Sequence, residues 1–300
     1  MKMPPNLKPK DKIAIICTAR AVEAIELQPA LKLLEQWGLV PVLGNTIGLR
    51  QHQFGGTDLE RAQDLQYAIN NPKIKAIWCA RGGYGTARIM DQIDFSPLLD
   101  NPKWIIGYSD VTAMHLHLQH LGLESLHAQM PVDIENKSKD TVESLKQSLL
   151  HNPIDIKYNS TFRCRSGESE GELIGGNLSV LYSTLGTYPI SVFSEKVLIL
   201  EDLDEYLYHI DRMMLNLYRV GLLKQISGLI VGGMNSMNDN AIPFGKTAYE
   251  IIDSYAKKLN IPVAFDAPIG HTVNNLALCL GKKVRLKVFE NKVSITYYYG

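Results

Sequence analysis

Short apolar runs alternate with helical stretches through the first half of the chain. The runs are apolar at successive positions and lie at residues 12–17, 39–43, 74–79 and 104–107. The stretches between and after them carry apolar side chains at helical spacing and lie at residues 21–37, 59–69, 86–92 and 111–120. Strands that are apolar on both faces are typical of parallel sheets with helices on each side. The pattern therefore predicts an α/β fold with an N-terminal, parallel-sheet, Rossmann-like domain.

The pattern changes in the middle of the chain. One helical stretch, ENKSKDTVESLKQSLLHNP, is followed by polar and irregular sequence through RCRSGESEGE. We therefore expect an N-terminal α/β domain over residues 1–150, a linker over 151–170 and a smaller, mixed α/β C-terminal domain over 171–300. The elements expected in the C-terminal domain are a turn (IGGN) and short helix at 173–186, strands at 196–200, 229–231 and 263–265, helices at 206–220 and 245–259, and a hairpin at 283–299.

Composition restricts the class of protein. Apolar residues make up 45% and charged residues 21% of the 300 residues, as in a globular protein with a sizeable core. Lysine plus arginine equals aspartate plus glutamate at 31 each, and no basic stripe is visible, so nucleic acid is not an expected partner. The cysteines at 17, 79, 164 and 279 form no C-x-x-C pair, which argues against a zinc site or a redox motif.

The location of the protein is inferred from its apolar runs. The first of them, residues 13–17, is too short and too late for the apolar core of a signal peptide. No segment approaches the roughly 18 apolar residues of a membrane span. We therefore expect a cytoplasmic protein without a membrane partner, whose cysteines are small buried hydrophobes in a reducing compartment.

A serine follows the apolar run at 104–107. In WIIGYSDVT, Ser109 stands two residues after Gly107, and a helical stretch begins at once. This strand–turn–helix context is typical of a nucleophile elbow, in which a tight turn exposes the serine hydroxyl. Val111 stands where the G-x-S-x-G pattern has its second glycine. Taken alone, the segment fits equally well a Ser109 or Asp110 side chain that only caps the helix.

A glycine-rich loop, CARGGYGTAR, follows the run at 74–79. Its glycines fit neither G-x-G-x-x-G nor a P-loop, so a nucleotide site is disfavoured. If Ser109 is a nucleophile, the backbone N–H groups of Gly82 and Gly83 suit an oxyanion hole. Two roles stay open for Arg81, which either binds a substrate carboxylate or pairs with an acidic side chain of the protein itself.

A serine nucleophile needs a base, and a base needs an orienting carboxylate. The histidines of HLHLQH lie on the helix after Ser109, where no carboxylate or cysteine completes a metal site. His271 lies instead in the loop DAPIGHTVNN, where functional side chains are often displayed. Glu201 is the first acidic residue after the run at 196–200, so we expect it to be rigid and partly buried. A loop histidine and a solvated acidic turn without any role remain the alternatives at this point.

Six segments together resemble the LD-carboxypeptidase family of serine peptidases. They are RGGYG at 81–85, GYSD at 107–110, GGNL at 175–178, LEDLDE at 200–205, IDRMM at 210–214 and GHTVNN at 270–275. The resemblance covers about residues 10–290 in the family's order. It implies a triad of Ser109, His271 and Glu201, assembled between the two domains. It also implies an oxyanion hole at the Gly82–Gly83 turn and the backbone N–H of Asp110.

The resemblance also implies an activity and a mode of assembly. Members are typically homodimers that use neither metal nor cofactor. The main substrate class is the murein tetrapeptide, from which the enzyme removes the terminal D-alanine during peptidoglycan recycling. A second branch of the family, the microcin C immunity peptidases, hydrolyses an aminoacyl-nucleotide amide. Two other classes stay open: a non-catalytic module that binds wall peptides, and a nucleotide-dependent enzyme, although CTARAVE lacks the expected glycines.

Overall fold

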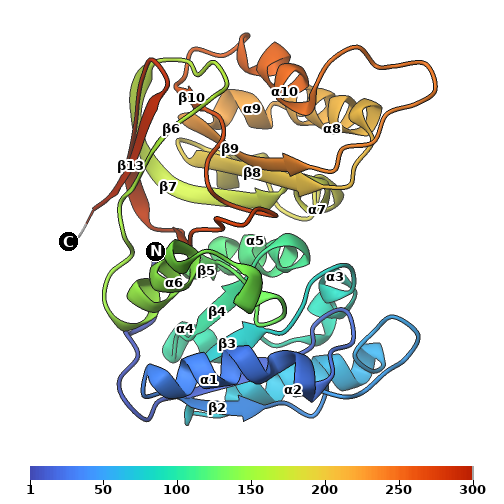
Figure 1. Cartoon of the computed structure of the whole chain (residues 1–300), viewed down its shortest axis with the longest axis vertical. Helices are drawn as coiled ribbons and strands as arrows, with labels where there is room; N and C mark the ends of the chain where they lie inside the picture. Colours follow the sequence, from blue (N-terminus) through green and yellow to red (C-terminus); the bar gives the residue numbers. More distant parts are fainter. Residues whose placement is uncertain (299–300) are drawn as a thin grey trace. The chain divides into compact units, whose positions relative to one another are not determined.

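The computed structural model describes residues 1–298 and divides into two compact units (Figure 1). The first unit comprises Met1–Pro153 and Val273–Gly281, and the second comprises Ile154–Thr272 and the described chain from Lys282 onward. The return of Val273–Gly281 to the first unit has no counterpart in the sequence patterns. No helix of the described chain is long and apolar enough to cross a membrane.

The first unit is built on a mostly parallel sheet. Its strand order is β11-β5-β4-β3-β1-β2, and β11 is antiparallel to β5. The strands are β1 (Lys12–Ile16), β2 (Val40–Leu43), β3 (Ile74–Cys79), β4 (Trp104–Gly107), β5 (Ser125–His127) and β11 (Leu278–Leu280). Residues in β1, β3 and β4 are buried at nearly every position, as expected for a sheet covered on both faces. The predicted fold class is therefore confirmed.

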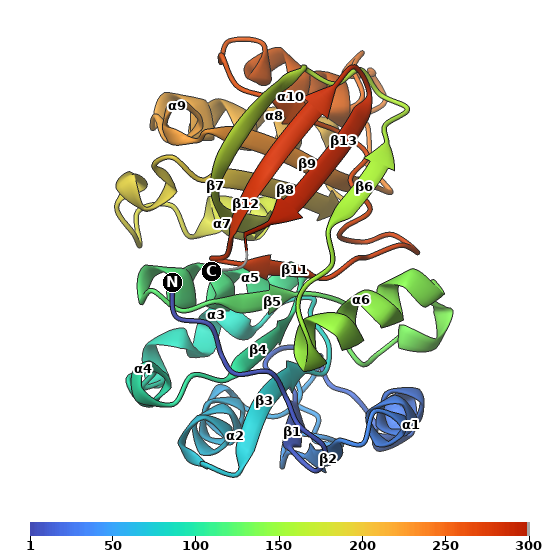
Figure 2. The ribbon, with the colours of Figure 1, turned by 90° about the vertical axis from the view of Figure 1, so that its left-hand side faces the viewer.

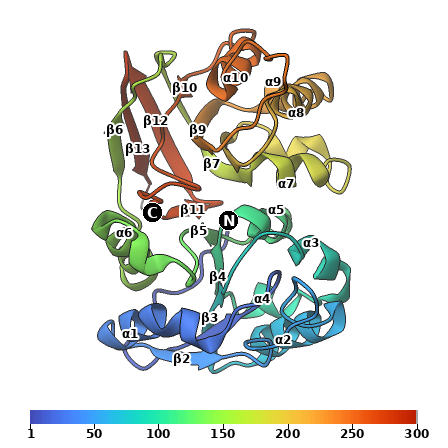
Figure 3. The same cartoon turned by 45° about the vertical axis from the view of Figure 1, so that its right-hand side comes forward.

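Helices cover both faces of this sheet. They are α1 (Gln28–Gln36), α2 (Asp58–Asn70), α3 (Thr86–Ile89), α4 (Pro97–Asp100), α5 (Thr112–His120) and α6 (Lys139–Leu150). Figures 2 and 3 show α1 and α6 on one face and α2, α3 and α4 on the other. Thr57 caps α2 by accepting a hydrogen bond from the N–H of Glu60. The helix predicted over 21–37 begins later, because a 3-10 turn (Ala24–Leu27) precedes α1.

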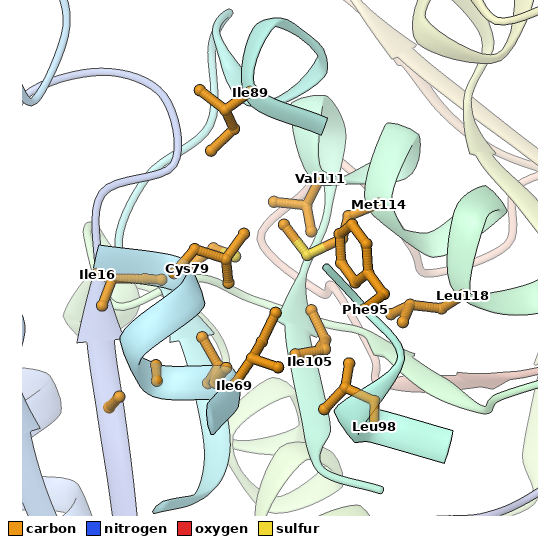
Figure 4. Close-up of a cluster of buried hydrophobic side chains, with 14 of the residues drawn as sticks. Ile16, Ile69, Cys79, Ile89, Phe95, Leu98, Ile105, Val111, Met114 and Leu118 are labelled. Carbon is orange, nitrogen blue, oxygen red and sulfur yellow. The ribbon is translucent and has the colours of Figure 1, made fainter. Parts of the chain in front are cut away.

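A cluster of buried side chains joins α2, α4 and α5 to the sheet (Figure 4). Ile16 and Ile105 project from β1 and β4, and Ile69 and Met114 meet them from α2 and α5. Val111 belongs to the same cluster, although it lies only two residues after Ser109. The turn that carries Ser109 is thus fixed to the core of the unit by a buried side chain, which removes conformational freedom from it.

The second unit contains a sheet of order β10-β9-β8-β7-β12-β13-β6. Its strands are β6 (Ile156–Asn159), β7 (Gly167–Asn177), β8 (Val197–Leu203), β9 (Gly228–Asn235), β10 (Val263–Ala264), β12 (Lys283–Phe289) and β13 (Lys292–Tyr297). The long strand β7 pairs antiparallel with β12 through its first half and parallel with β8 through its second. In β12 and β13 burial alternates, so this end of the sheet has one buried and one solvated face.

The helices of the second unit are α7 (Leu178–Ser183), α8 (Leu207–Arg219), α9 (Leu222–Gln225) and α10 (Ala248–Ala256). One face of α8 is buried, and its residues are Ile210, Met213, Met214 and Leu217. The prediction of a turn at IGGN was wrong, because these residues form the end of β7. Within 151–170, expected as a linker, the structure has β6 and the start of β7. The predicted hairpin ends at Tyr299, which lies outside the described residues.

Candidate active site

Ser109 occupies a sharp turn at the carboxyl end of β4. Its φ is 60°, in the left-handed region that a side chain other than glycine rarely adopts, and the residue is half-buried. Gly107 permits this turn, because a Cβ there would lie 2.7 Å from Cγ2 of Val111. A residue held in such a conformation is over-determined by its surroundings, which is a frequent property of active-site residues.

His115 fixes the start of the same turn from α5. Its Nε2 donates to the carbonyl of Gly107 at 2.9 Å, so Nδ1 accepts from the hydroxyl of Ser125 at 2.8 Å. Burial lowers the pKa of His115 to about 3, which keeps the imidazole neutral. Of the histidines in HLHLQH, His115 therefore has a structural role. No group of three or more histidine, cysteine, aspartate or glutamate side chains suited to a metal occurs within residues 1–298.

The glycine-rich loop lies against the serine turn within the first unit. A Cβ added to Gly82 would be 3.5 Å from Cβ of Ser109 and 3.6 Å from Cβ of Asp110. Gly83 has a φ of 101°, and a Cβ there would be 2.5 Å from Nε of Arg20. The loop thus requires glycine both for its backbone conformation and for close approach.

The carboxylate of Asp110 connects the serine turn to the glycine-rich loop. It accepts the backbone N–H of Thr86, at the start of α3, at 2.8 Å. Burial raises the pKa of Asp110, although the N–H groups of Thr86 and Gly85 and the charge of Arg61 oppose the shift. The two segments are therefore joined by a hydrogen bond that is shielded from water.

Arg61 binds the backbone of the glycine-rich loop. This guanidinium is fully buried and donates to the carbonyls of Thr18 and Gly85, the latter at 2.9 Å. Its charge is compensated by an ion pair with Asp58, which also receives Arg88 at 2.6 Å. No sequence pattern indicated a role for Arg61, because an arginine within an amphipathic helix normally lies on the solvated face.

The structure answers part of the question about Arg81. Its Nη1 lies 3.8 Å from Oε1 of Glu26, and both side chains are well exposed. Arg81 therefore pairs with an acidic side chain of the protein itself, at a distance typical of a weak surface ion pair.

In the second unit the structure brings Glu201 and His271 together. Oε2 of Glu201 accepts a hydrogen bond from Nδ1 of His271 at 2.7 Å. Glu201 is fully buried, and the side chain of His271 is 16% exposed. Because a carboxylate can only accept, Nδ1 carries the proton in the neutral ring, and Nε2 is the unprotonated nitrogen. Ser109 belongs to the other unit.

Glu201 lies within β8 rather than after it. Its predicted place was just beyond the strand, but β8 continues to Leu203. Position 201 faces the loop that carries His271, since a Cβ on Gly270 would lie 2.6 Å from Oε2 of Glu201. Gly270 has a φ of 87°, so glycine serves both the turn and the close approach.

Asn235 holds the backbone of His271, and Asp202, next to Glu201, joins β8 to the start of α7. The side-chain amide of Asn235, at the end of β9, donates to the carbonyl of His271. The carboxylate of Asp202 accepts the N–H of Ser179 and the side-chain amide of Asn177, each at 2.9 Å. Burial, followed by the charge of Glu201, raises the pKa of Asp202 to about 7. LEDLDE contained the signal for Asp202, but nothing in the sequence distinguished it from its acidic neighbours.

The chain belongs to the LD-carboxypeptidase family. The family model described as LD-carboxypeptidase N-terminal domain matches residues 13–128, and that of the C-terminal domain matches residues 170–286. The resemblance drawn from the six motifs is therefore confirmed. Family membership and the carboxypeptidase names of the relatives support a peptidase.

Two related sequences and one solved structure are similar to the chain over most of its length. A probable murein peptide carboxypeptidase of Bacillus subtilis is 32% identical over 97% of this chain and 94% of its own length. The microcin C7 self-immunity protein MccF of Escherichia coli is 28% identical over 90% of this chain and 87% of its own. The crystal structure of a muramoyltetrapeptide carboxypeptidase from Oxalobacter formigenes is 27% identical, with a TM-score of 0.86 over 96% of this chain and 99% of that one.

Proposed function

We propose that the protein is a serine carboxypeptidase that hydrolyses the bond between an L-centre and the terminal D-alanine of murein tetrapeptides. The observation that carries the proposal is the buried Glu201 carboxylate bonded to Nδ1 of His271 at 2.7 Å. A carboxylate in this position fixes one tautomer and stabilises the imidazolium that forms during general base catalysis. The hydroxyl of Ser109, on a turn with left-handed backbone conformation, is the proposed nucleophile.

The proposed reaction has two steps. As Ser109 Oγ attacks the carbonyl carbon of the penultimate residue, Nε2 of His271 takes the hydroxyl proton. The same nitrogen then gives that proton to the amine of D-alanine, which leaves as the C–N bond breaks. Water attacks the resulting ester with the help of His271, the truncated peptide departs, and Ser109 regains its proton. Apart from water, these steps use only groups of the protein and need neither metal nor cofactor.

We propose that backbone N–H groups of Gly82, Gly83 and Asp110 stabilise the oxyanion of both tetrahedral intermediates. The proximity of Gly82 to Ser109 and the hydrogen bond from Thr86 to Asp110 support this role. Fixed donors of this kind need no reorganisation as charge develops, and removing one typically costs about 3–4 kcal/mol of transition-state stabilisation.

The substrate assignment follows the names of the relatives. Those from Bacillus subtilis and Oxalobacter formigenes are named for murein peptides and muramoyltetrapeptide, respectively. The alternative is an immunity peptidase that cleaves an aminoacyl-nucleotide amide, which the likeness to MccF supports. Both reactions break an amide bond and require the same triad, so the substrate distinguishes them.

The test is mass spectrometry of defined substrates. We expect the protein to remove one alanine from a murein tetrapeptide that ends in D-alanine, and to leave the L-alanine epimer and an aminoacyl-nucleotide conjugate intact. Ser109→Ala should abolish the mass loss, whereas Ser96→Ala, an exposed serine of the same unit, should retain it. Full turnover by Ser109→Ala would contradict the proposal, and cleavage of the nucleotide conjugate alone would favour the immunity activity.

We also propose a cytoplasmic homodimer. All four cysteines are buried thiols without a disulfide, which suits a reducing compartment. The dimer is expected from the family resemblance. Light scattering coupled to size-exclusion chromatography tests it, and a monomeric mass of 33.5 kDa at micromolar concentration would contradict it.

A further inference from the structure

We propose that Arg20 binds the terminal carboxylate of the peptide and thereby makes the enzyme an exopeptidase. This inference rests on the proposed function and adds a specificity residue to it. Sequence patterns gave no reason to select Arg20, which stands between the apolar run of β1 and the 3-10 turn at Ala24–Leu27.

Covalent geometry restricts where the terminal carboxylate binds. In the last residue of a peptide, the carboxyl carbon is three bonds from the scissile carbonyl carbon. Summed bond lengths keep the two atoms within about 4 Å of each other. A group that recognises the carboxylate must therefore lie next to the donors that bind the scissile carbonyl oxygen. In the proposed mechanism these donors include Gly82 and Gly83.

Arg20 meets this requirement. A Cβ on Gly83 would lie 2.5 Å from Nε, 2.6 Å from Cδ and 3.0 Å from Cγ of Arg20. The arginine side chain thus runs directly over the backbone of Gly83, in space that only glycine leaves open. Because a guanidinium presents its donors in a planar fork, it matches the two oxygens of a carboxylate.

The backbone around Arg20 is held on both sides. The carbonyl of Ala19 accepts the N–H of Gly55 at 3.0 Å, and the N–H of Ala21 donates to the carbonyl of Gln53 at 2.9 Å. Arg20 itself forms an isolated antiparallel bridge with Phe54. A binding residue on so constrained a segment loses little conformational entropy when the ligand arrives.

The charge of Arg20 is also available for a ligand. The other arginines of the first unit form ion pairs, namely Arg50 with Glu23, Arg61 with Asp58, Arg81 with Glu26 and Arg88 with Asp58. Within residues 1–298, Arg20 alone of this set has no acidic partner, and its side chain is exposed. A substrate carboxylate would have to displace Glu26 from Arg81, whereas no acidic side chain competes with it for Arg20.

The experiment compares two substrates that differ only at the terminus. One is the tetrapeptide with a free D-alanine carboxylate, and the other is its D-alaninamide. For Arg20→Gln we expect kcat/KM on the acid to fall about 10- to 100-fold, mainly through KM, as for loss of a charge-assisted hydrogen bond. The amide should be cleaved equally well by both proteins. Arg20→Lys should restore part of the preference for the acid, because it keeps the charge without the fork.

Controls separate this inference from its alternatives. Arg50→Gln, an exposed and paired arginine of the same unit, should leave the ratio of acid to amide cleavage unchanged, and equal thermal midpoints show that each variant folds. An unchanged ratio in Arg20→Gln, or a collapsed ratio in Arg81→Gln instead, overturns the role of Arg20 while Ser109 keeps its role. A wild-type protein that cleaves no tetrapeptide overturns the proposed function itself.

Discussion

In both units a buried aspartate, next to Ser109 or Glu201, accepts a backbone N–H at the start of a helix. In the first, Asp110 follows Ser109 and accepts the N–H of Thr86 at the start of α3. In the second, Asp202 follows Glu201 and accepts an N–H at the start of α7. Each helix comes after a glycine-rich segment that continues the neighbouring strand, CARGGYG after β3 and IGGN at the end of β7. Both aspartates have a raised pKa because they are buried.

The two aspartates make the same contact, but the residues before them, Ser109 and Glu201, differ in backbone conformation and burial. Ser109 lies beyond its strand with a φ of 60° and is half-buried, whereas Glu201 stays within β8, paired with β7 at a point where the register against β9 shifts, and is fully buried. In the proposed mechanism Ser109 is the nucleophile, and its place beyond the end of the strand leaves it accessible to a substrate. An orienting carboxylate must stay in the sheet, away from water that would weaken its hydrogen bond. Predictions that compare substitutions at Ser109 and Asp110 with substitutions at Glu201 and Asp202 can separate these roles.

The largest effect is expected when either reacting group is removed. His271→Ala and Ser109→Ala should each lower kcat by about 10⁶-fold, and the double variant should be no slower than either single one, because residues that act as a unit are not additive. Single-turnover kinetics with the tetrapeptide measure this. Independent, multiplying losses would mean that the two residues do not act in one step.

A smaller loss is expected from the orienting carboxylate. Glu201→Gln keeps the size of the side chain but favours the wrong tautomer of His271, so kcat should fall by about 10⁴-fold with little change in KM. The matched control is Glu205→Gln, which removes the half-buried carboxylate that pairs with His209 at 2.6 Å and should leave kcat unchanged. A loss below tenfold in Glu201→Gln would contradict the orienting role.

The aspartate that follows Ser109 should matter less than the residues it positions. Asp110→Ala releases the N–H of Thr86 and should lower kcat about 100-fold, since small displacements of catalytic groups have effects of this size. Asp94→Ala removes a similar contact, to the N–H of Ser96 at 2.9 Å, but on the surface away from the turn. The comparison fails if both variants lose activity equally, or if KM alone changes in Asp110→Ala.

The smallest effect concerns the pH dependence of stability through Asp202. Its folded-state pKa of about 7 lies above the ordinary value of 3.8, so the folded protein holds a proton that the unfolded chain releases. The contribution to stability is therefore lost as the pH rises from about 4 to about 7. Asp202→Asn should flatten this slope in urea unfolding at a series of pH values. An identical slope in the variant would show that Asp202 does not titrate in this range.

Patterns in the sequence predicted the elements that are local. The bounds of β3 and β4 match the apolar runs residue for residue. The pairing of Glu201 with His271 was predicted from the chemistry of the residues and the family resemblance. Local patterns could not predict it, because 70 residues separate the two in sequence. No periodicity connects positions so far apart.

Other features depend on contacts that a local window does not contain. IGGN was predicted to be a turn because glycine favours turns, yet a Cβ on Gly175 would lie 2.2 Å from the carbonyl oxygen of Ile199 in β8. Its glycines therefore serve the close approach of two strands. Strands β5 and β11 were missed because each has three residues, and they form a sheet only with distant partners. Arg61 was missed because its burial depends on the loops around it.

The placement of β11 has a consequence for synthesis of the chain. Leu278–Leu280 completes the sheet of the first unit by pairing with Ser125–His127. A ribosome must therefore translate the chain as far as Leu280, long after it has made β5, before that sheet acquires its last strand. Until then β5 presents an unpaired edge, which is the kind of surface that nascent-chain chaperones cover and that promotes aggregation. Cutting the gene after codon 153 would make this transient exposure permanent.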